Sequence, residues 1–242
     1  MKTNLDKDTS FFITGVPRSG TTLLCNFFNS LEDGFCFGEP LRYYLDHLYC
    51  GGLRETVDNC FGKIKASHIP ADLQVLNISE FPSIFPEYNL GGLKETYTEW
   101  MITSTGSILL ENFHVYDLGI IVIRNPEDVF ASNKALSEKR LLMTVRDLNN
   151  AYLFFNEMEI KHSNVHILVL EDFVTAGIDY VNSVLPFNIE GEFELKPTGH
   201  TYGDPYANKS TELKHNDRYV LLTEDEKEEM FIARQIWDRY RV

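Results

Sequence analysis

Residues 11–22 read FFITGVPRSGTT, in which a short apolar run, Phe11 to Thr14, leads into a glycine loop. A helix is expected to follow from about Thr21 to Leu31. This order of strand, loop and helix is the context that a phosphate-binding loop requires. Backbone N–H groups and the positive end of the helix dipole converge there on an anion, and glycines let the chain approach it closely. The expected binding residues are Pro17, Arg18, Ser19, Gly20, Thr21 and Thr22.

The loop differs at one position from that of nucleotide-triphosphate-binding proteins. The spacing G-x-x-x-x-G is kept from Gly15 to Gly20, but Thr21 stands where a lysine normally reaches the β and γ phosphates. A loop without this lysine is poorly equipped to transfer a terminal phosphoryl group. The cation lies inside the loop, as Arg18, whose guanidinium can bind a phosphate and the group attached to it in a forked geometry.

Apolar runs elsewhere predict an α/β fold. Short unbroken apolar stretches suit parallel strands that are buried on both faces, and helical patterns alternate with them. Such an alternation implies a mostly parallel sheet flanked by helices, with ligands at the carboxyl ends of the strands. The expected strands are 11–14, 35–37, 107–110, 120–123 and 165–170. The expected helices are about 21–31, one from Pro126, 141–161, and a last one that opens with a Thr223-x-x-Glu226 capping box.

Two stretches lack a clear pattern. Residues 50–92 are punctuated by prolines and by Gly51-Gly52 and Gly91-Gly92, and we interpret them as an insertion or lid. Residues 197–217 are interpreted as a loop that covers the substrate or donor, because loops of that length are usually functional or mobile. No linker divides the chain, so residues 1–242 are expected to form one domain.

Composition excludes several classes of partner. The net charge of −14 repels polyanions, so neither nucleic acid nor an anionic membrane is expected as the main partner, whereas a small anion can still bind at a local positive site. The first ten residues are polar and the apolar run at 11–16 is too short for a signal peptide or a membrane span, so a cytoplasmic protein is expected. Cys25, Cys36, Cys50 and Cys60 lack metal-site spacing and are expected to be free thiols.

A second anion site is expected at the end of the run 120–123. Arg124 follows this strand directly, and Asn125 can cap the helix that Pro126 begins. An arginine at that point faces the ligand crevice. The alternative is a structural ion pair with Asp128, but beside the glycine loop a second phosphate site is the better explanation.

With these two stretches the chain resembles the superfamily of sulfotransferases that use 3'-phosphoadenosine 5'-phosphosulfate (PAPS). FFITGVPRSGTTLL (11–24) is similar to the 5'-phosphosulfate loop of the family, and IIVIRNPEDVFAS (120–132) is similar to its 3'-phosphate motif. The resemblance implies the P-loop NTPase-like sulfotransferase fold. It also implies transfer of a sulfonate group from PAPS to an acceptor hydroxyl, with 3',5'-ADP and a sulfate ester as products and no metal.

The resemblance also assigns roles to residues. Arg124 and Ser132 correspond to the arginine and serine that bind the 3'-phosphate. Lys209 and Ser210 lie where many members close over the same phosphate, and VHILVLEDF (165–173) resembles a later strand of the family. The acceptor would carry a hydroxyl and could be a small molecule, a carbohydrate or a peptide.

Sulfonate transfer requires a general base, because the acceptor hydroxyl loses its proton as it attacks. Glu39 is the first candidate, since it follows the strand expected at 35–37, near its carboxyl end and beside the loop. The segment resembles the Gly-Glu of tyrosylprotein sulfotransferases, whose glutamate is taken to be the base, and the Glu-Pro-Leu of carbohydrate sulfotransferases. The alternative is that Glu39 merely pairs with Arg42.

His114 is the second candidate base, because cytosolic members use a histidine after the strand that here reads SILL (107–110). The chain departs from the family at this point. The lysine that commonly follows the strand is replaced by Glu111-Asn112, so Arg18, helped by Arg42, would have to steady the sulfonate.

Other hypotheses change the donor or remove the reaction. Glu171-Asp172 at the end of a strand could bind magnesium, which would favour an ATP-dependent small-molecule kinase, although Asp172 is better interpreted as a helix cap. A non-catalytic nucleotide-binding module is a third hypothesis. His162 and His166 have the spacing of a zinc pair but straddle a helix end and a strand start, so no metal site is expected.

Overall fold

A computed structural model describes most of the two ends and the middle of the chain. The described residues are 1–5, 8–39, 60, 62–70, 85, 87–97, 116–136, 143–192 and 221–242.

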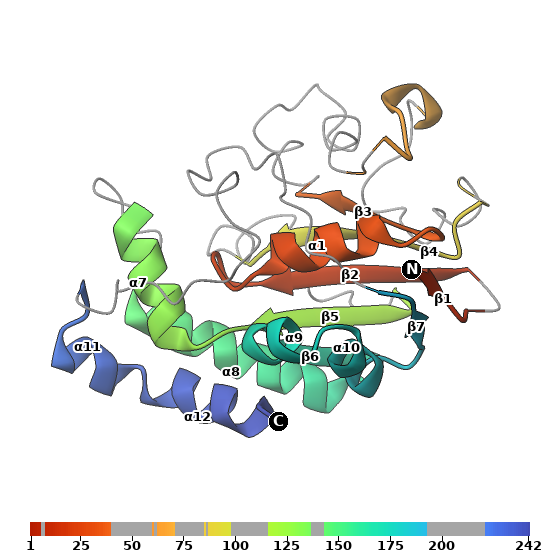
Figure 1. Ribbon diagram of the computed structural model, residues 1–242. Coiled ribbons are helices and arrows are strands. Elements are labelled where there is room, and N and C mark those ends of the chain that lie inside the picture. Colours follow the sequence, from red (N-terminus) through yellow and green to blue (C-terminus); the bar gives the residue numbers. More distant parts are fainter. Residues whose placement is uncertain are drawn as a thin grey trace.

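A five-stranded parallel sheet forms the centre of the described structure, in the order β3-β4-β2-β5-β6 (Figure 1). All residues of β2 and β5 are buried, as expected for strands covered on both faces. The glycine loop leaves β2, which is the middle strand. The bounds are β2 Thr9–Gly15, β3 Gly34–Gly38, β4 Leu90–Thr96, β5 Leu118–Ile123 and β6 Val165–Val169.

Helices cover both faces of this sheet. On one face lie α1, α9 and α10, and Phe27 of α1 contacts Phe173 of α9 edge to face, with ring centroids 5.3 Å apart. The long α8 lies on the other face, and α12 packs along it (Figure 1). The bounds are α1 Thr21–Ser30, α7 Pro126–Leu136, α8 Val145–Lys161, α9 Leu170–Ala176, α10 Ile178–Val184, α11 Glu224–Glu229 and α12 Phe231–Tyr240, with a short 3-10 helix η2 at Ala66–His68.

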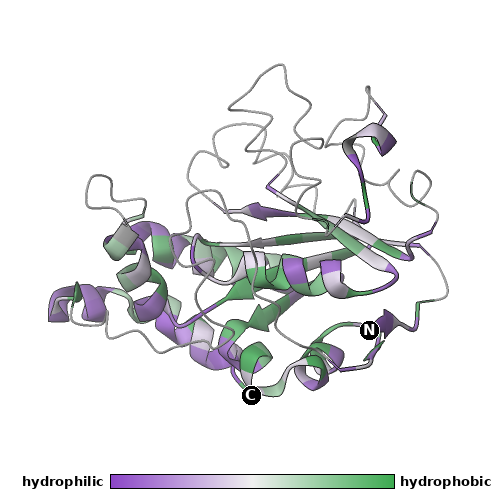
Figure 2. Ribbon diagram, turned by 45° about the horizontal axis from the view of Figure 1, so that its top comes forward, coloured by the Kyte–Doolittle hydropathy of each residue, from purple (hydrophilic) through white to green (hydrophobic). Residues whose placement is uncertain are grey.

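The core lies between the layers. The strands are mostly hydrophobic along their length, whereas the outer helices carry hydrophilic residues (Figure 2). Buried side chains recur at helical spacing on α8, as Leu148, Tyr152 and Phe155, so this helix packs one apolar face on the sheet. Beside the main sheet, β1 (Lys2–Thr3) pairs antiparallel with β7 (Ile189–Glu190).

Predicted start signals are confirmed at two helices, and a third helix has one that was not predicted. The Thr223 side chain accepts from the backbone of Glu226, whose carboxylate accepts in turn from the backbone of Thr223, and this capping box opens α11. Thr144 forms a similar box with Asp147, which was not predicted, and it starts α8 at Val145 where a start near residue 141 was expected. Asn125 Oδ1 accepts from Glu127 N at 2.9 Å, so Asn125 caps α7 as predicted.

Strand β4 was not predicted, and it corrects two expectations. Residues 90–92 belong to the sheet and not to an insertion, and β4 separates β3 from β2. Gly91 and Gly92 were interpreted as part of that insertion, but both positions are inside the sheet, where neighbouring residues leave no room for a side chain. A Cβ at Gly92 would lie 2.2 Å from the Phe11 carbonyl oxygen, and one at Gly91 would lie 2.6 Å from the Phe35 ring.

Two helix expectations also need correction. The last helix is broken at Met230 into α11 and α12. Asp172 is not a cap, because α9 begins at Leu170 and places Asp172 inside the first turn, where its carboxylate accepts from Val242 N at 3.2 Å. The expected strand at 107–110 and the loop at 197–217 lie outside the described residues.

Candidate functional site

The glycine loop ends in an uncapped helix terminus. Gly20 precedes α1 in a left-handed conformation (φ 99°), no side chain caps the helix, and its first turn holds no acidic residue. The first helical bond runs from Leu24 N to Gly20 O, at 3.2 Å. The N–H groups of Thr21, Thr22 and Leu23 precede that bond and have no helical partner, which makes this terminus suitable for an anion.

Gly20 also allows the loop to pack closely against α9. A Cβ at this position would lie 2.5 Å from Leu170 Cδ1, so a larger residue would clash with α9 as well as strain the backbone.

The hydroxyl groups of the loop differ in exposure. Ser19 is fully buried, and its Oγ, which has no hydrogen-bond partner in the described part of the chain, lies 2.5 Å from the position of a Cβ at Gly15. Thr21 is also buried, whereas Thr22 is partly exposed. An unpaired buried hydroxyl is costly, and an anion held by the loop would lie among groups that can donate to it.

The two predicted anion motifs meet in space. Arg18 Nε donates to Ser132 Oγ at 3.1 Å, and Arg124 Nη1 donates to the Arg18 carbonyl at 3.3 Å. Asn133 Nδ2 donates to the Pro17 carbonyl at 3.2 Å. Arg124, which follows β5, and two residues of α7 therefore hold the loop that follows β2, at the carboxyl ends of two adjacent strands.

Arg124 makes the structural ion pair that the sequence offered as the alternative to a phosphate site. Its Nη2 lies 3.6 Å from Asp128 Oδ2, one helical turn along α7, so the alternative ion pair is present. Its Nη1 nevertheless reaches the glycine loop, as stated above. The side chain keeps 20% of its surface exposed, so solvent or a ligand can contact it.

The backbone of Arg124 is held by a side chain of α8, the helix on the face of the sheet opposite α1. The buried Tyr152 hydroxyl accepts from Arg124 N at 3.3 Å and donates to the Arg124 carbonyl. Burial raises the pKa of Tyr152, so this hydroxyl keeps its proton for the donated bond. Arg124 therefore has a fixed position at the end of β5.

Glu171 supports the next residue. One carboxylate oxygen accepts from Asn125 N at 2.8 Å and the other from Trp237 Nε1 at 3.3 Å, so Glu171 ties the turn after β5 to α12. This structural use argues against the interpretation of Glu171 as a magnesium ligand. Within the described residues, no group of three or more His, Cys, Asp or Glu side chains could hold a metal ion.

Glu39 lies at the carboxyl end of β3 and has a buried lysine as its partner. Lys94 Nζ donates to Glu39 Oε1 at 2.5 Å, and Thr96 Oγ1 donates to the same oxygen at 2.9 Å. The backbone is tied as well, because Glu39 N donates to the Lys94 carbonyl at 2.7 Å and Glu39 adopts a left-handed φ of 54°. Burial alone would lower the pKa of Lys94, but the Glu39 carboxylate outweighs this effect and raises it.

Lys94 and Thr96 lie between Glu39 and the glycine loop. In the sheet register Lys94 pairs with Gly38 on one side and Ile13 on the other, and Thr96 pairs with Gly15. Glu39 was expected directly beside the loop, and β4 intervenes. Sequence reasoning missed Lys94 and Thr96 because it missed their strand; the charged Lys94-Glu95 pair in a short run after two glycines was the available signal.

Comparison with solved structures places this arrangement in a known fold. The structure is similar to that of the sulfotransferase domain from the Synechococcus PCC 7002 olefin synthase, with a TM-score of 0.65 and 14% sequence identity over 99% of this chain and 98% of that one. The chain has the sulfotransferase fold. The predicted α/β class and the resemblance to the superfamily are thereby confirmed at the level of fold.

Sequence comparison adds no relative to this sulfotransferase fold. No protein-family model and no curated protein matches the chain. The assignment of individual site residues therefore depends on the geometry given above.

Several predicted site residues lie outside the described part of the sulfotransferase fold. They are His114, Lys209 and Ser210, together with Arg42, and their roles stay predictions.

Across the described residues, no helix is long and apolar enough to cross a membrane.

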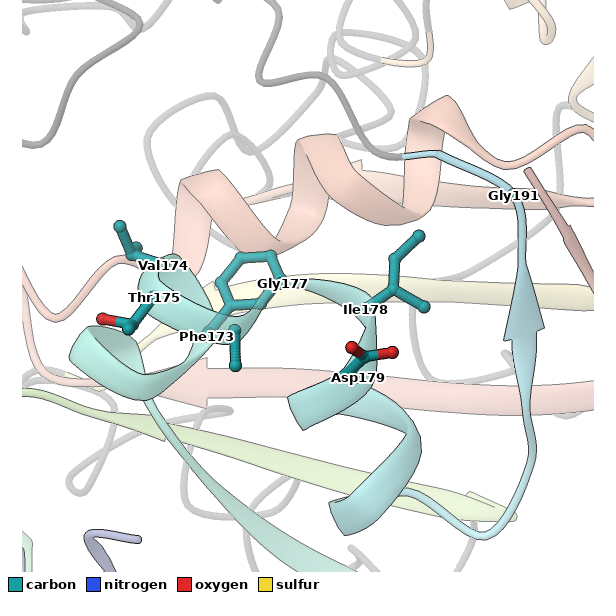
Figure 3. A pocket seen from close by; sticks show the side chains of 8 residues that line it. Phe173, Val174, Thr175, Gly177, Ile178, Asp179 and Gly191 are labelled. Atoms are coloured by element: carbon teal, nitrogen blue, oxygen red, sulfur yellow. The ribbon is translucent and has the colours of Figure 1, made fainter.

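A pocket of about 420 Å³ lies elsewhere in the fold, at the junction of α9 and α10 (Figure 3). Phe173, Ile178 and Asp179 are among the residues that line it, together with Gly177 and Gly191. None of the predicted donor-binding residues lines this pocket, so it is separate from the candidate site.

Proposed function

We propose that this protein transfers a sulfonate group from PAPS to an acceptor hydroxyl, with 3',5'-ADP and a sulfate ester as products. The observation that carries the proposal is the contact between two anion motifs that lie more than a hundred residues apart. Arg18 of the glycine loop donates to Ser132, and Arg124 donates to the Arg18 carbonyl. A donor with negative groups at both its 5' and 3' ends matches such a double site.

The residues present fit this donor. The first-turn N–H groups of α1 and the Arg18 guanidinium would hold the 5' end, and Arg124 and Ser132 would hold the 3'-phosphate. The absence of acidic residues from the first turn of α1 favours a negative ligand there. When bound, PAPS supplies the sulfonate group, and the nucleotide bisphosphate is the leaving group.

Glu39 would act as the general base. The O–S bond to the acceptor forms while the bond between sulfur and the bridging phosphate oxygen breaks, and the acceptor proton passes to the Glu39 carboxylate. Lys94 and Thr96 both donate to Oε1, which holds this oxygen of the carboxylate in place. A base held in this way needs little reorganisation before it accepts a proton.

The kinase alternative keeps the fold but needs ATP and magnesium. Thr21 replaces the phosphate-binding lysine, and both oxygens of Glu171 are engaged in structural bonds, so the chain offers little for that chemistry.

Ligand preference tests the proposal directly. A ligand that binds the native state raises the melting temperature, so 3',5'-ADP in EDTA is expected to stabilise the protein and ATP with magnesium is not. Arg124→Ala is expected to remove most of the stabilisation by 3',5'-ADP. Stabilisation by ATP and magnesium alone would instead support the kinase.

The acceptor and the cellular setting belong to the same proposal. We propose a hydroxyl-bearing small molecule, carbohydrate or peptide as acceptor, and a cytoplasmic protein of one domain without a nucleic-acid partner. Incubation with radiolabelled PAPS and fractionated extract from the source would identify the acceptor class.

A further inference from the structure

We infer that Glu171 and Trp237 are positioning residues for the nucleotide site, which link the turn after β5 to the helix α12. The proposed function assigns neither residue a contact with the donor, and no residue of α12 belongs to the candidate site. The inference rests on that function, because the position that Glu171 fixes is the position of Arg124. Its consequence is that one contact of α12, made outside the candidate site, changes the affinity for the nucleotide.

Glu171 uses each of its two carboxylate oxygens for a different element. Oε1 accepts from Asn125 N at 2.8 Å, and Oε2 accepts from Trp237 Nε1 at 3.3 Å. Hydrogen bonds to an ionised carboxylate are stronger than those between neutral groups. A single side chain of α9 therefore joins the turn that follows β5 to α12.

The peptide group between Arg124 and Asn125 is held at both of its polar atoms. The Tyr152 hydroxyl donates to the Arg124 carbonyl oxygen, and Glu171 accepts from the N–H group of Asn125. In a planar trans peptide these two atoms point in opposite directions, so the two bonds together set the orientation of the plane. A shift of Glu171 would release one side of this plane and, with it, the backbone of Arg124.

Asn125 passes the effect of this bond on to α7. Its side chain accepts from Glu127 N at 2.9 Å and its carbonyl accepts from Val129 N at 3.0 Å, so Asn125 begins the helix. The same helix carries Ser132. Glu171 thus supports both the strand end at Arg124 and the start of the helix with Ser132.

Further contacts hold Trp237 against α9. Trp237 is buried, and the guanidinium carbon of Arg241 lies 4.8 Å from the centroid of its ring. Val242 N donates to Asp172 Oδ2 at 3.2 Å, and Asp172 is the residue after Glu171. The indole N–H therefore reaches Glu171 from a side chain that is itself fixed in place.

The start of α9 also touches the glycine loop. Leu170 packs against Gly20, where an added Cβ would lie 2.5 Å from Leu170 Cδ1. Leu170 directly precedes Glu171, so the first turn of α9 contacts both predicted anion motifs while it binds Trp237. Loss of the Trp237 bond is therefore expected to disturb the nucleotide site through α9.

Trp237→Phe tests this link, because phenylalanine keeps an aromatic ring against α9 but lacks the Nε1–H group. The affinity for 3',5'-ADP in isothermal calorimetry is expected to fall about twofold to tenfold, as for residues that share a hydrogen-bond network. Glu171→Gln keeps the size of the side chain but can accept through one oxygen only, and it should weaken binding by a similar factor. In the double variant the combined loss should be smaller than the product of the two single losses, because both changes break the same link.

Tyr240→Phe is the matched control on the same helix. It removes a hydroxyl that lies 3.1 Å from Asn156 Oδ1 and from Glu159 Oε2, so it alters a contact of α12 with α8 and leaves the contact with α9 intact. This variant should bind 3',5'-ADP like the wild type. All affinities are measured well below the melting temperature of each variant, so that unfolding does not enter the comparison.

The indole N–H signal of Trp237 in NMR spectra gives a second measurement, which a purely structural role would not change. The chain has two tryptophans, and the signal is assigned by its loss in Trp237→Phe. In the wild-type protein it is expected to shift when 3',5'-ADP binds, and in Glu171→Gln it should shift less.

Three results would overturn the link and leave the proposed function standing. They are an unchanged affinity in both Trp237→Phe and Glu171→Gln, equal losses in Trp237→Phe and Tyr240→Phe, and a wild-type indole signal that 3',5'-ADP does not move. Failure of the wild type to bind 3',5'-ADP would overturn the proposed function and the inference with it.

Discussion

Lys94 Nζ lies 2.5 Å from Glu39 Oε1, and only 3% of the Lys94 side chain is exposed, against 25% for Glu39. An ammonium that is removed from water needs a nearby anion, and loss of one partner of a buried pair leaves an uncompensated charge. The pair is therefore asymmetric, because Glu39 can be solvated without Lys94 but Lys94 depends on Glu39. Because of this asymmetry, the role of Glu39 in activity and the contribution of the pair to stability can be tested with separate variants.

Glu39→Gln tests the proposed base. Gln keeps an oxygen that can accept from Lys94 and Thr96 but cannot take the acceptor proton. Transfer of radiolabelled sulfonate is expected to fall by about two orders of magnitude or more, as for loss of a general base, while calorimetry shows unchanged binding of 3',5'-ADP. Unchanged transfer would move the role of the base to His114, and loss of both transfer and binding would indicate a damaged site.

Lys94→Met tests the charge of the pair through its pH dependence. Because the pKa of Lys94 is raised above its ordinary value of 10.5, the pair stabilises the fold fully below that pH, and this contribution is lost as the pH rises through the folded-state pKa. The difference in unfolding free energy between wild type and Lys94→Met should thus be constant near neutral pH and shrink above pH 10.5. Urea unfolding across this range would measure it. A difference that grows with pH contradicts the raised pKa.

The sequence predicts the sheet strands that obey the apolar rule, and β4 shows why the rule is incomplete. β2, β5 and β6 are apolar runs, and each was predicted to within a few residues. β4 contains the buried charged residues Lys94 and Glu95, of which Lys94 pairs with Glu39 on the neighbouring strand end, and two glycines that contact Phe11 and Phe35. These causes come from the register of neighbouring strands, which a local pattern does not contain.

Gly92→Ala tests this account of β4. The added Cβ would lie 2.2 Å from the Phe11 carbonyl oxygen on the adjacent strand, so the strands must shift. Overpacking of this kind costs about 1–3 kcal/mol, which denaturant unfolding resolves. Gly62→Ala is the matched control, because its Cβ would meet nothing within 4 Å and only its φ of 77° opposes the change. A smaller loss at Gly92 than at Gly62 would show that β4 is not packed this tightly.

The candidate site was predictable as residue types but not as contacts. The glycine loop, Arg124 and Ser132 follow from their positions after apolar runs and from the family resemblance. The hydrogen bond between Arg18 and Ser132 joins residues that are 114 positions apart. The Tyr152 hydroxyl, which binds the Arg124 backbone, comes from α8 on one face of the sheet. Tyr152 has the spacing of a core residue, so its sequence context gave no sign that its hydroxyl serves the site.

Tyr152→Phe tests whether that hydroxyl positions Arg124. The change leaves the Arg124 backbone N–H and carbonyl without this partner, and each unsatisfied buried group costs about 1–3 kcal/mol, so the fold should be destabilised. Because Arg124 would then lose its fixed position, the affinity for 3',5'-ADP should fall by roughly tenfold, the effect of about one lost hydrogen bond to a charged group.

Tyr240→Phe provides the comparison for this prediction. The Tyr240 hydroxyl lies 3.1 Å from both Asn156 Oδ1 and Glu159 Oε2 on α8, so that it can donate to either, and it belongs to no element of the candidate site. It should change 3',5'-ADP binding little, whatever its effect on the melting temperature. If the two variants weaken binding equally, the loss follows from general destabilisation. If Tyr152→Phe alone weakens it, the strand end at Arg124 is part of the nucleotide site, held in place from the opposite face of the sheet.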